Sequence, residues 1–246
     1  MPPGTLNREA LGLVPWVVAS WLSSIGAGLF LWLAPRWGKW PRDAVRFLES
    51  PSGPVSPGEV IALLHALGLP YAAILAGMLS PEAMGLAGFS WWPTLGRGGL
   101  LAAGFLLLTG LSWRAYLRST TPPADLLGRQ RRLAAAPAGW PLFLLWAAAE
   151  QSHWALYRTL PLLVWGRPAG LWLGLLLLLA ERCALPRTAG RLRQPGGLEE
   201  EAWWLARAVG LTAVFAVLGN LWACIVLQAL LEGGVAWIVQ RRAAAP

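Results

Sequence analysis

Ionisable side chains stand inside an otherwise apolar stretch, residues 139–165, where their types could support hydrolysis. His153, Tyr157 and Arg158 follow Glu150 by three, seven and eight residues, so on a helix all four share one face. A carboxylate and an imidazole can together activate a water molecule against a peptide carbonyl. Charged groups are costly in lipid and usually have a role there, so this face is a candidate site.

A second polar stripe lies near the end of the sequence. Asn220, Cys224, Gln228 and Glu232 recur at every fourth residue, which places them along one side of a helix. A rise of 1.5 Å per residue brings Gln228 and Glu232 to the membrane depth of the first group. We expect Glu181 somewhat deeper, beside Arg182. We therefore take as candidate catalytic residues Glu150, His153 and Glu232, and as a binding or structural polar cluster Tyr157, Arg158, Asn220, Gln228 and Glu181.

The elements that position these residues are predicted to be transmembrane helices. The chain has 246 residues, of which 56% are hydrophobic and 13% charged, and its mean hydropathy is +0.51. These values are typical of an integral membrane protein. Many of the 17 Trp flank apolar runs, as expected at the headgroup level. The net charge of +8 is better explained by basic loops that set the membrane topology than by binding of nucleic acid.

The apolar runs predict an all-α, polytopic bundle of about seven transmembrane helices, with the first run retained rather than removed as a signal peptide. The predicted spans are 11–35, 59–79, 98–116, 139–165, 168–181, 205–218 and 220–240, the last two divided at Gly219-Asn220. Seven crossings place fifteen Lys and Arg on one side and three on the other. The positive-inside rule then predicts an outside N-terminus and a cytoplasmic C-terminus. If the last two spans were one helix, the C-terminal arginines would change sides.

Composition shifts divide the sequence into three parts. We expect a three-helix membrane region over 1–119, a cytoplasmic linker over 120–136 and a four-helix membrane region over 137–246, which carries most of the intramembrane polar groups. The expected location is the plasma membrane.

The last stripe resembles a known motif. Residues 219–232, GNLWACIVLQALLE, are similar to the final motif of the CPBP family of intramembrane proteases (CAAX prenyl protease and bacteriocin-processing enzymes), which reads like G-S-L-W-x-x-I-L-L-H-A-L-x-N. The resemblance covers about residues 134–240. It implies that Gln228 stands where the family has a catalytic His, and Glu232 where it has Asn or Asp.

The other motifs of the family are altered. Its Glu-Glu-x-x-x-Arg motif is best matched by His153-Trp154-Ala-Leu-Tyr-Arg158, which keeps the Arg and replaces both glutamates. Its aromatic-x-x-x-His motif falls near Leu177 and Glu181, and neither matches. The resemblance therefore implies a relative that has lost its catalytic groups. A zinc site usually needs several His, and the chain has two, so we expect no cofactor unless the protease chemistry is retained.

These patterns leave three functions open. The first is a non-catalytic binding or scaffold protein whose partners are the bilayer and a lipid, a membrane peptide or a partner helix. The second is an active intramembrane peptidase with a rearranged site of Glu150, His153 and Glu232, dependent on a divalent metal such as zinc. The third is a subunit of a larger membrane complex or a small transporter.

Several polar residues also have structural interpretations. Arg158 is expected to pair with Glu150 or Glu232 and so lock the bundle. Asn220 is typical of a helix start. His65 is expected to be buried and bonded to a carbonyl of a neighbouring helix. The run Glu199-Glu200-Glu201 is expected to be the solvated first turn of a helix.

Overall fold

The protein is all-α. A computed structural model describes residues 8–50, 53–120 and 126–243, is 86% helical, and contains no strand in those ranges. Residues 121–125 of the predicted linker lie outside this description. The helices are α1 (Arg8–Trp37), α2 (Lys39–Glu49), α3 (Pro57–Leu75), α4 (Pro81–Met84), α5 (Trp91–Pro93), the π-helical turn η1 (Thr94–Gly98), α6 (Gly99–Ser119), α7 (Gly128–Ala135), α8 (Gly139–Trp165), α9 (Arg167–Ala184), α10 (Pro186–Arg191), α11 (Gly197–Leu218) and α12 (Leu221–Ala243).

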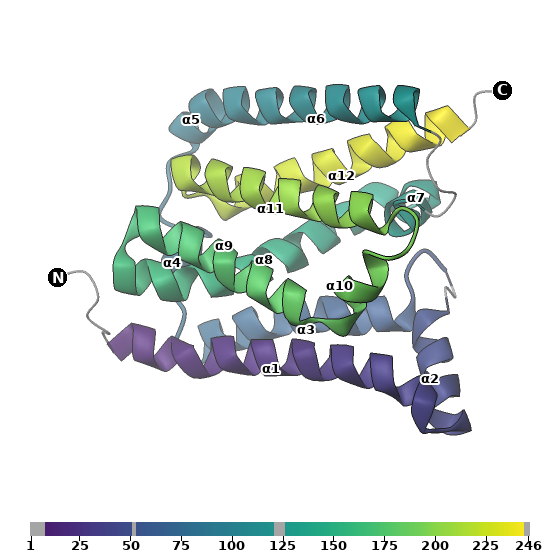
Figure 1. Ribbon diagram of the computed structural model, residues 1–246. Helices are drawn as coiled ribbons and strands as arrows, with labels where there is room; N and C mark the ends of the chain where they lie inside the picture. The colour runs from purple at the N-terminus through teal and green to yellow at the C-terminus, as the bar shows by residue number, and fades with distance from the viewer. Residues whose placement is uncertain (1–7, 51–52, 121–125, 244–246) are drawn as a thin grey trace.

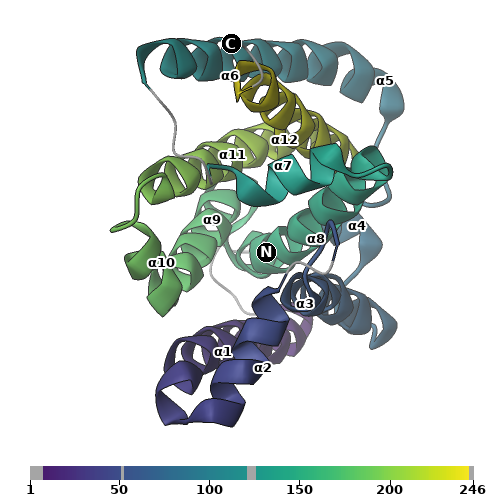
Figure 2. The ribbon, with the colours of Figure 1, turned by 90° about the vertical axis from the view of Figure 1, so that its right-hand side faces the viewer.

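The seven long helices run alongside one another (Figure 1). Helices α1 and α3 form one side of the bundle, α6 forms the opposite side, and α8 and α9 lie between them with α11 and α12 (Figures 1 and 2). The short helices α2, α7 and α10 gather at the end where α1 finishes and α12 finishes. The Arg-rich segments are therefore brought to one end of the bundle.

Each predicted span corresponds to a helix in the structure. The span 139–165 has the same bounds as α8, and the span 205–218 begins eight residues after the start of α11. The ends of the other spans differ from those of the helices by one to four residues. Five helical segments are long and apolar enough to cross a membrane: Glu9–Trp37, Pro57–Leu75, Gly96–Ser119, Gly197–Leu218 and Leu221–Arg242. Helices α8 and α9 are not among them. Seven crossings, the orientation of the termini and the division into two membrane regions stay predictions.

The break between α11 and α12 has a local cause. Gly219 adopts a left-handed conformation with φ of 61°, which a residue without Cβ reaches at little cost, and its N–H donates to the carbonyl of Phe215. The side-chain oxygen of Asn220 then accepts from the backbone N–H of Ala223 at 3.2 Å. Asn220 thus caps the start of α12, which confirms its interpretation as a helix-start residue.

Replacing Asn220 with alanine should lower the free energy of unfolding by about 1 kcal/mol, because α12 would lose a side-chain acceptor at its first turn. Thermal unfolding of the purified protein in detergent would measure this. Asn220→Ser keeps a neutral acceptor at this buried position and should cost less than the alanine variant. Equal losses for the two variants would contradict a capping role.

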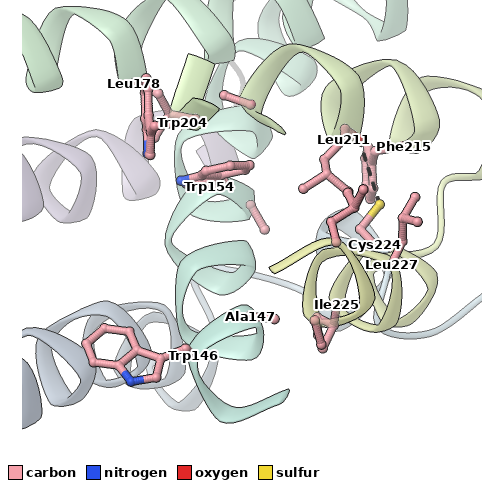
Figure 3. Close-up of a cluster of buried hydrophobic side chains, with 14 of the residues drawn as sticks. Trp146, Ala147, Trp154, Leu178, Trp204, Leu211, Phe215, Cys224, Ile225 and Leu227 are labelled. Carbon is pink, nitrogen blue, oxygen red and sulfur yellow. Dashed lines mark hydrogen bonds between the residues drawn. The ribbon is translucent and has the colours of Figure 1, made fainter. Parts of the chain in front are cut away.

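The apolar core lies where α8, α11 and α12 meet. Figure 3 shows Leu211 and Phe215 of α11 facing Cys224 and Leu227 of α12, and all four are buried. On the other side of α8, Trp154 meets Trp204 edge to face, with ring centroids 6.1 Å apart. Polar side chains of α8 are therefore held between two packed apolar layers, and their positions are fixed by that packing.

Candidate functional site

A partly open cavity of two adjacent chambers, which share several lining residues, lies beside α8. The first chamber has a volume of about 640 Å³, within the range of ligand pockets. Apolar side chains line much of it, and its polar lining consists of Ser23 and Ser24 of α1, His65 of α3, Arg129 of α7, Glu150 and His153 of α8, and Glu181 and Arg182 of α9. The second chamber, also about 640 Å³, shares Arg129, Trp146, Glu150 and Arg182 with the first.

Glu150 and Glu232 meet around one guanidinium. Arg207, in the middle of α11, donates from Nη1 to Glu150 Oε2 at 3.1 Å, and the same nitrogen binds Glu232 Oε1. The Glu232 side chain is 2% exposed and that of Glu150 is 20% exposed. A carboxylate buried to this extent requires a counter-charge. Arg207 therefore pairs with two of the three predicted catalytic residues.

Gln228 joins the same two carboxylates through its amide. Its Nε2 donates to Glu150 Oε2 and, at 3.1 Å, to Glu232 Oε1. Its Oε1 accepts from Gln151 Nε2 at 2.7 Å. Because residues 228 and 232 are one helical turn apart on α12, the amide and the carboxylate face α8 together. The result is a buried network spanning α8, α11 and α12.

His153 belongs to a separate polar group across the cavity. Its Nε2 lies 3.0 Å from Glu181 Oε2, and its ring packs edge to face on Tyr157 at 4.8 Å between centroids. The ring of His65 is 5.9 Å away, and His65 Nε2 is bonded to Ser23 Oγ at 2.7 Å. Glu150 and His153 therefore line the same chamber but have different partners.

The prediction that Arg158 pairs with Glu150 or Glu232 is wrong. The guanidinium of Arg158 is buried and lies 4.1 Å over the ring of Phe215, and none of its nitrogens meets an acceptor in the described part of the chain. Neither Glu150 nor Glu232 pairs with it, since Arg207 occupies that position. The rotation of α8 turns Arg158 toward Phe215 on α11 and Glu150 toward the cavity, which residue spacing alone could not distinguish.

The remaining predicted residues have local partners. The Tyr157 hydroxyl donates to Ser20 Oγ at 3.2 Å, which ties α8 to α1. Asn220 Nδ2 is 3.4 Å from Thr94 Oγ1. Glu181 was expected beside Arg182, but it points into the cavity toward His153. Arg182 instead forms two 2.8 Å hydrogen bonds with Glu201.

Two further expectations need correction. His65 is half-buried, and its partner is a hydroxyl of α1 rather than a carbonyl. The acidic run at the start of α11 is bonded rather than solvated: Glu199 accepts from the Tyr116 hydroxyl at 3.1 Å, Glu200 accepts from the Leu127 N–H at 3.1 Å, and Glu201 binds Arg182. The run therefore connects α11 to α6, to the start of α7 and to α9.

Arg207 is the central residue that the sequence interpretation missed. It lies within an apolar run of α11. Because a charged group in lipid is costly, its position there indicates a role as strongly as the position of Glu150 does. Gln151, next to Glu150, was also missed, although a buried amide needs a partner.

The arrangement gives little support to hydrolysis. A general base takes a proton on a lone pair, and in both Glu150 and Glu232 one carboxylate oxygen is already engaged by Arg207 and Gln228. The residues also do not fit a zinc ion: among the described residues, no three His, Cys, Asp or Glu side chains are arranged to hold a metal. Both cysteines are free, and Cys224 is buried in the core.

No known protein family, curated protein or solved structure matches this chain in the comparisons made. The class of protein therefore rests on the helices themselves. An all-α fold with five helices long and apolar enough to cross a membrane indicates a helical membrane protein.

Proposed function

We propose that this chain is a multi-pass plasma-membrane protein, a degenerate relative of the CPBP proteases, whose cavity binds a molecule from the bilayer without cleaving it. The observation that carries this proposal is the double pairing of Arg207 with Glu150 and Glu232. A guanidinium held between the two carboxylates stabilises their charged forms and engages one oxygen of each, which makes both weaker bases.

The lining of the cavity supports binding. Apolar side chains such as Phe30, Ile61 and Leu178 form much of the wall of the first chamber, and a few polar groups point inward. This combination is typical of sites for amphiphilic molecules. The occupant is a lipid, a membrane peptide or a helix of a partner protein.

Glu150→Gln should weaken binding of a membrane ligand to the purified protein several-fold, because the variant disturbs the network at the boundary of the two chambers. The same binding assay on His153→Ala tests the second polar group of the first chamber, and Glu82→Gln, at an exposed carboxylate on α4, is the matched control. Incubation of the wild-type protein with membrane peptides and divalent metal should yield no cleavage products by mass spectrometry. Cleavage that Glu150→Gln abolishes would contradict the proposal.

An active peptidase is the second candidate, because Glu150 and His153 line one chamber together with Glu181. In that case His153 would be the base, and the hydrogen bond between its Nε2 and Glu181 would orient its ring. Glu232 would serve only to hold Arg207 in place. Peptide cleavage lost in His153→Ala and kept in Glu82→Gln would favour this candidate.

A further inference from the structure

A surface pocket away from the cavity lies where α6 and α12 end. Its volume is about 290 Å³, and its lining consists of Arg114, Leu117 and Arg118 of α6 and Trp237, Ile238, Arg241 and Arg242 of α12. The last turns of α12 lie beside α6 in both views of the bundle (Figures 1 and 2). Four arginines from two helices therefore line one small space, which we call the arginine pocket.

The positive charge of the arginine pocket is not matched by carboxylates. All four arginines are exposed, and none of them forms an ion pair with a described residue. No Asp or Glu of the described ranges lines the pocket. Arg114 and Arg118 lie one turn apart on α6, a spacing at which like charges repel each other. The negative ends of two helix dipoles supply only about one elementary charge in total, so the pocket stays strongly positive.

One of these guanidinium groups is positioned by an aromatic ring. The Cζ of Arg241 lies 4.1 Å from the centroid of the Trp237 ring. Stacking uses the face of a guanidinium and leaves the N–H donors in its plane for other partners, and two such donors fit two phosphate oxygens. The Trp237 side chain is 47% exposed, as is typical of tryptophans at the headgroup level of a bilayer.

The arginine pocket lies at the ends of two helical segments that are long and apolar enough to cross a membrane, Gly96–Ser119 and Leu221–Arg242. Arg118 is the last residue but one of the first segment, and Arg242 is the last residue of the second. The guanidinium groups are therefore at the level where these helices would leave the hydrocarbon core, which is the depth of lipid phosphates.

Exposed apolar side chains continue each helix face from the pocket toward the membrane interior. On α6, Leu107 and Leu111 are exposed and precede Arg114 by seven and three residues, so they share its face. On α12, Leu230 is exposed and precedes Trp237 by seven residues, so the two lie on one face. A molecule with a phosphate in the arginine pocket could therefore lay hydrocarbon chains along both helices.

We propose that the arginine pocket binds the headgroup of an anionic phospholipid. The phosphate oxygens accept hydrogen bonds from the guanidinium groups, and the acyl chains lie on the exposed leucines of α6 and α12. Basic pockets between transmembrane helices are typical sites for anionic headgroups. The arginine pocket shares no lining residue with the cavity beside α8, so this site does not depend on the function proposed for that cavity.

Native mass spectrometry of the full-length protein in detergent tests this with three probes: dioleoyl phosphatidylglycerol, dioleoyl phosphatidylcholine and inorganic phosphate. Phosphatidylglycerol should bind at least about tenfold more tightly than the other two. Two double variants, Arg114→Gln with Arg118→Gln and Arg241→Gln with Arg242→Gln, should each weaken its binding at least about tenfold, since one arginine near anionic lipid contributes about fivefold. The matched control is Lys39→Gln with Arg193→Gln, which removes two exposed charges from other segments and should bind as the wild type does.

Each contrary result overturns a particular part of the proposal. Phosphatidylcholine that binds as tightly as phosphatidylglycerol overturns the anionic headgroup, and inorganic phosphate that binds as tightly overturns the lipid source. An equal loss of phosphatidylglycerol binding in the control and in the two arginine variants would show a diffuse attraction to basic residues instead of a site. Binding that both arginine variants retain would place the lipid elsewhere on the protein.

Discussion

Replacing Arg207 with methionine should lower the free energy of unfolding by about 3–5 kcal/mol, the largest loss we expect from any single substitution in this chain. The side chain is 3% exposed and pairs with Glu150 and with Glu232. Methionine keeps much of the apolar volume but leaves Glu232 with only the distant guanidinium of Arg129 at 3.8 Å. Unfolding followed by tryptophan fluorescence in detergent would measure the loss.

The control for this variant is Arg193→Met, at an exposed arginine that precedes α11, which should change stability by less than about 0.5 kcal/mol. Adding Glu150→Gln and Glu232→Gln to Arg207→Met should recover most of the lost stability, because the triple variant buries no uncompensated charge. An Arg207→Met protein as stable as Arg193→Met would show that Arg207 does not hold the two carboxylates together.

Gly174→Ala should lower the free energy of unfolding by about 3 kcal/mol, because it forces apart the closely packed α8 and α9. A Cβ on Gly174 would lie 2.7 Å from the Cα of Arg158, and one on Gly170 would lie 2.6 Å from the Cα of Leu162. Backbone atoms cannot move aside as a flexible side chain can, so overpacking here is costly. Small residues at such crossings are typical of membrane helices.

Gly234→Ala is the matched control for this crossing. Gly234 also lies inside a helix, α12, but a Cβ there would meet nothing within 4 Å. Alanine should therefore stabilise the protein by about 0.5–1 kcal/mol through helix propensity. Thermal unfolding of both variants in one detergent compares them directly, and a Gly174→Ala protein that gains stability as Gly234→Ala does would contradict the close approach of α8 and α9.

The sequence determined the helices of this protein. Apolar runs of about 20 residues fix where a chain becomes helical in a membrane, because every backbone N–H and C=O must be bonded within the segment. Residues 139–165 were predicted with the bounds that α8 has, although α8 is not among the helices long and apolar enough to cross a membrane. Gly219 and Asn220 carry their own local signals, a left-handed conformation and a cap, so the break between α11 and α12 was also predictable.

The tertiary structure alone decided which charged groups meet. Residue spacing places Glu150, His153 and Arg158 on a face of α8, but the rotation and tilt of three other helices determine what that face contacts. Arg207 could bind Glu150 and Glu232 only once α11 was packed against α8 and α12. Electrostatic pairing falls off within a few ångströms, so small differences in helix packing decide the partners, and these differences arise from the whole bundle rather than from any one segment.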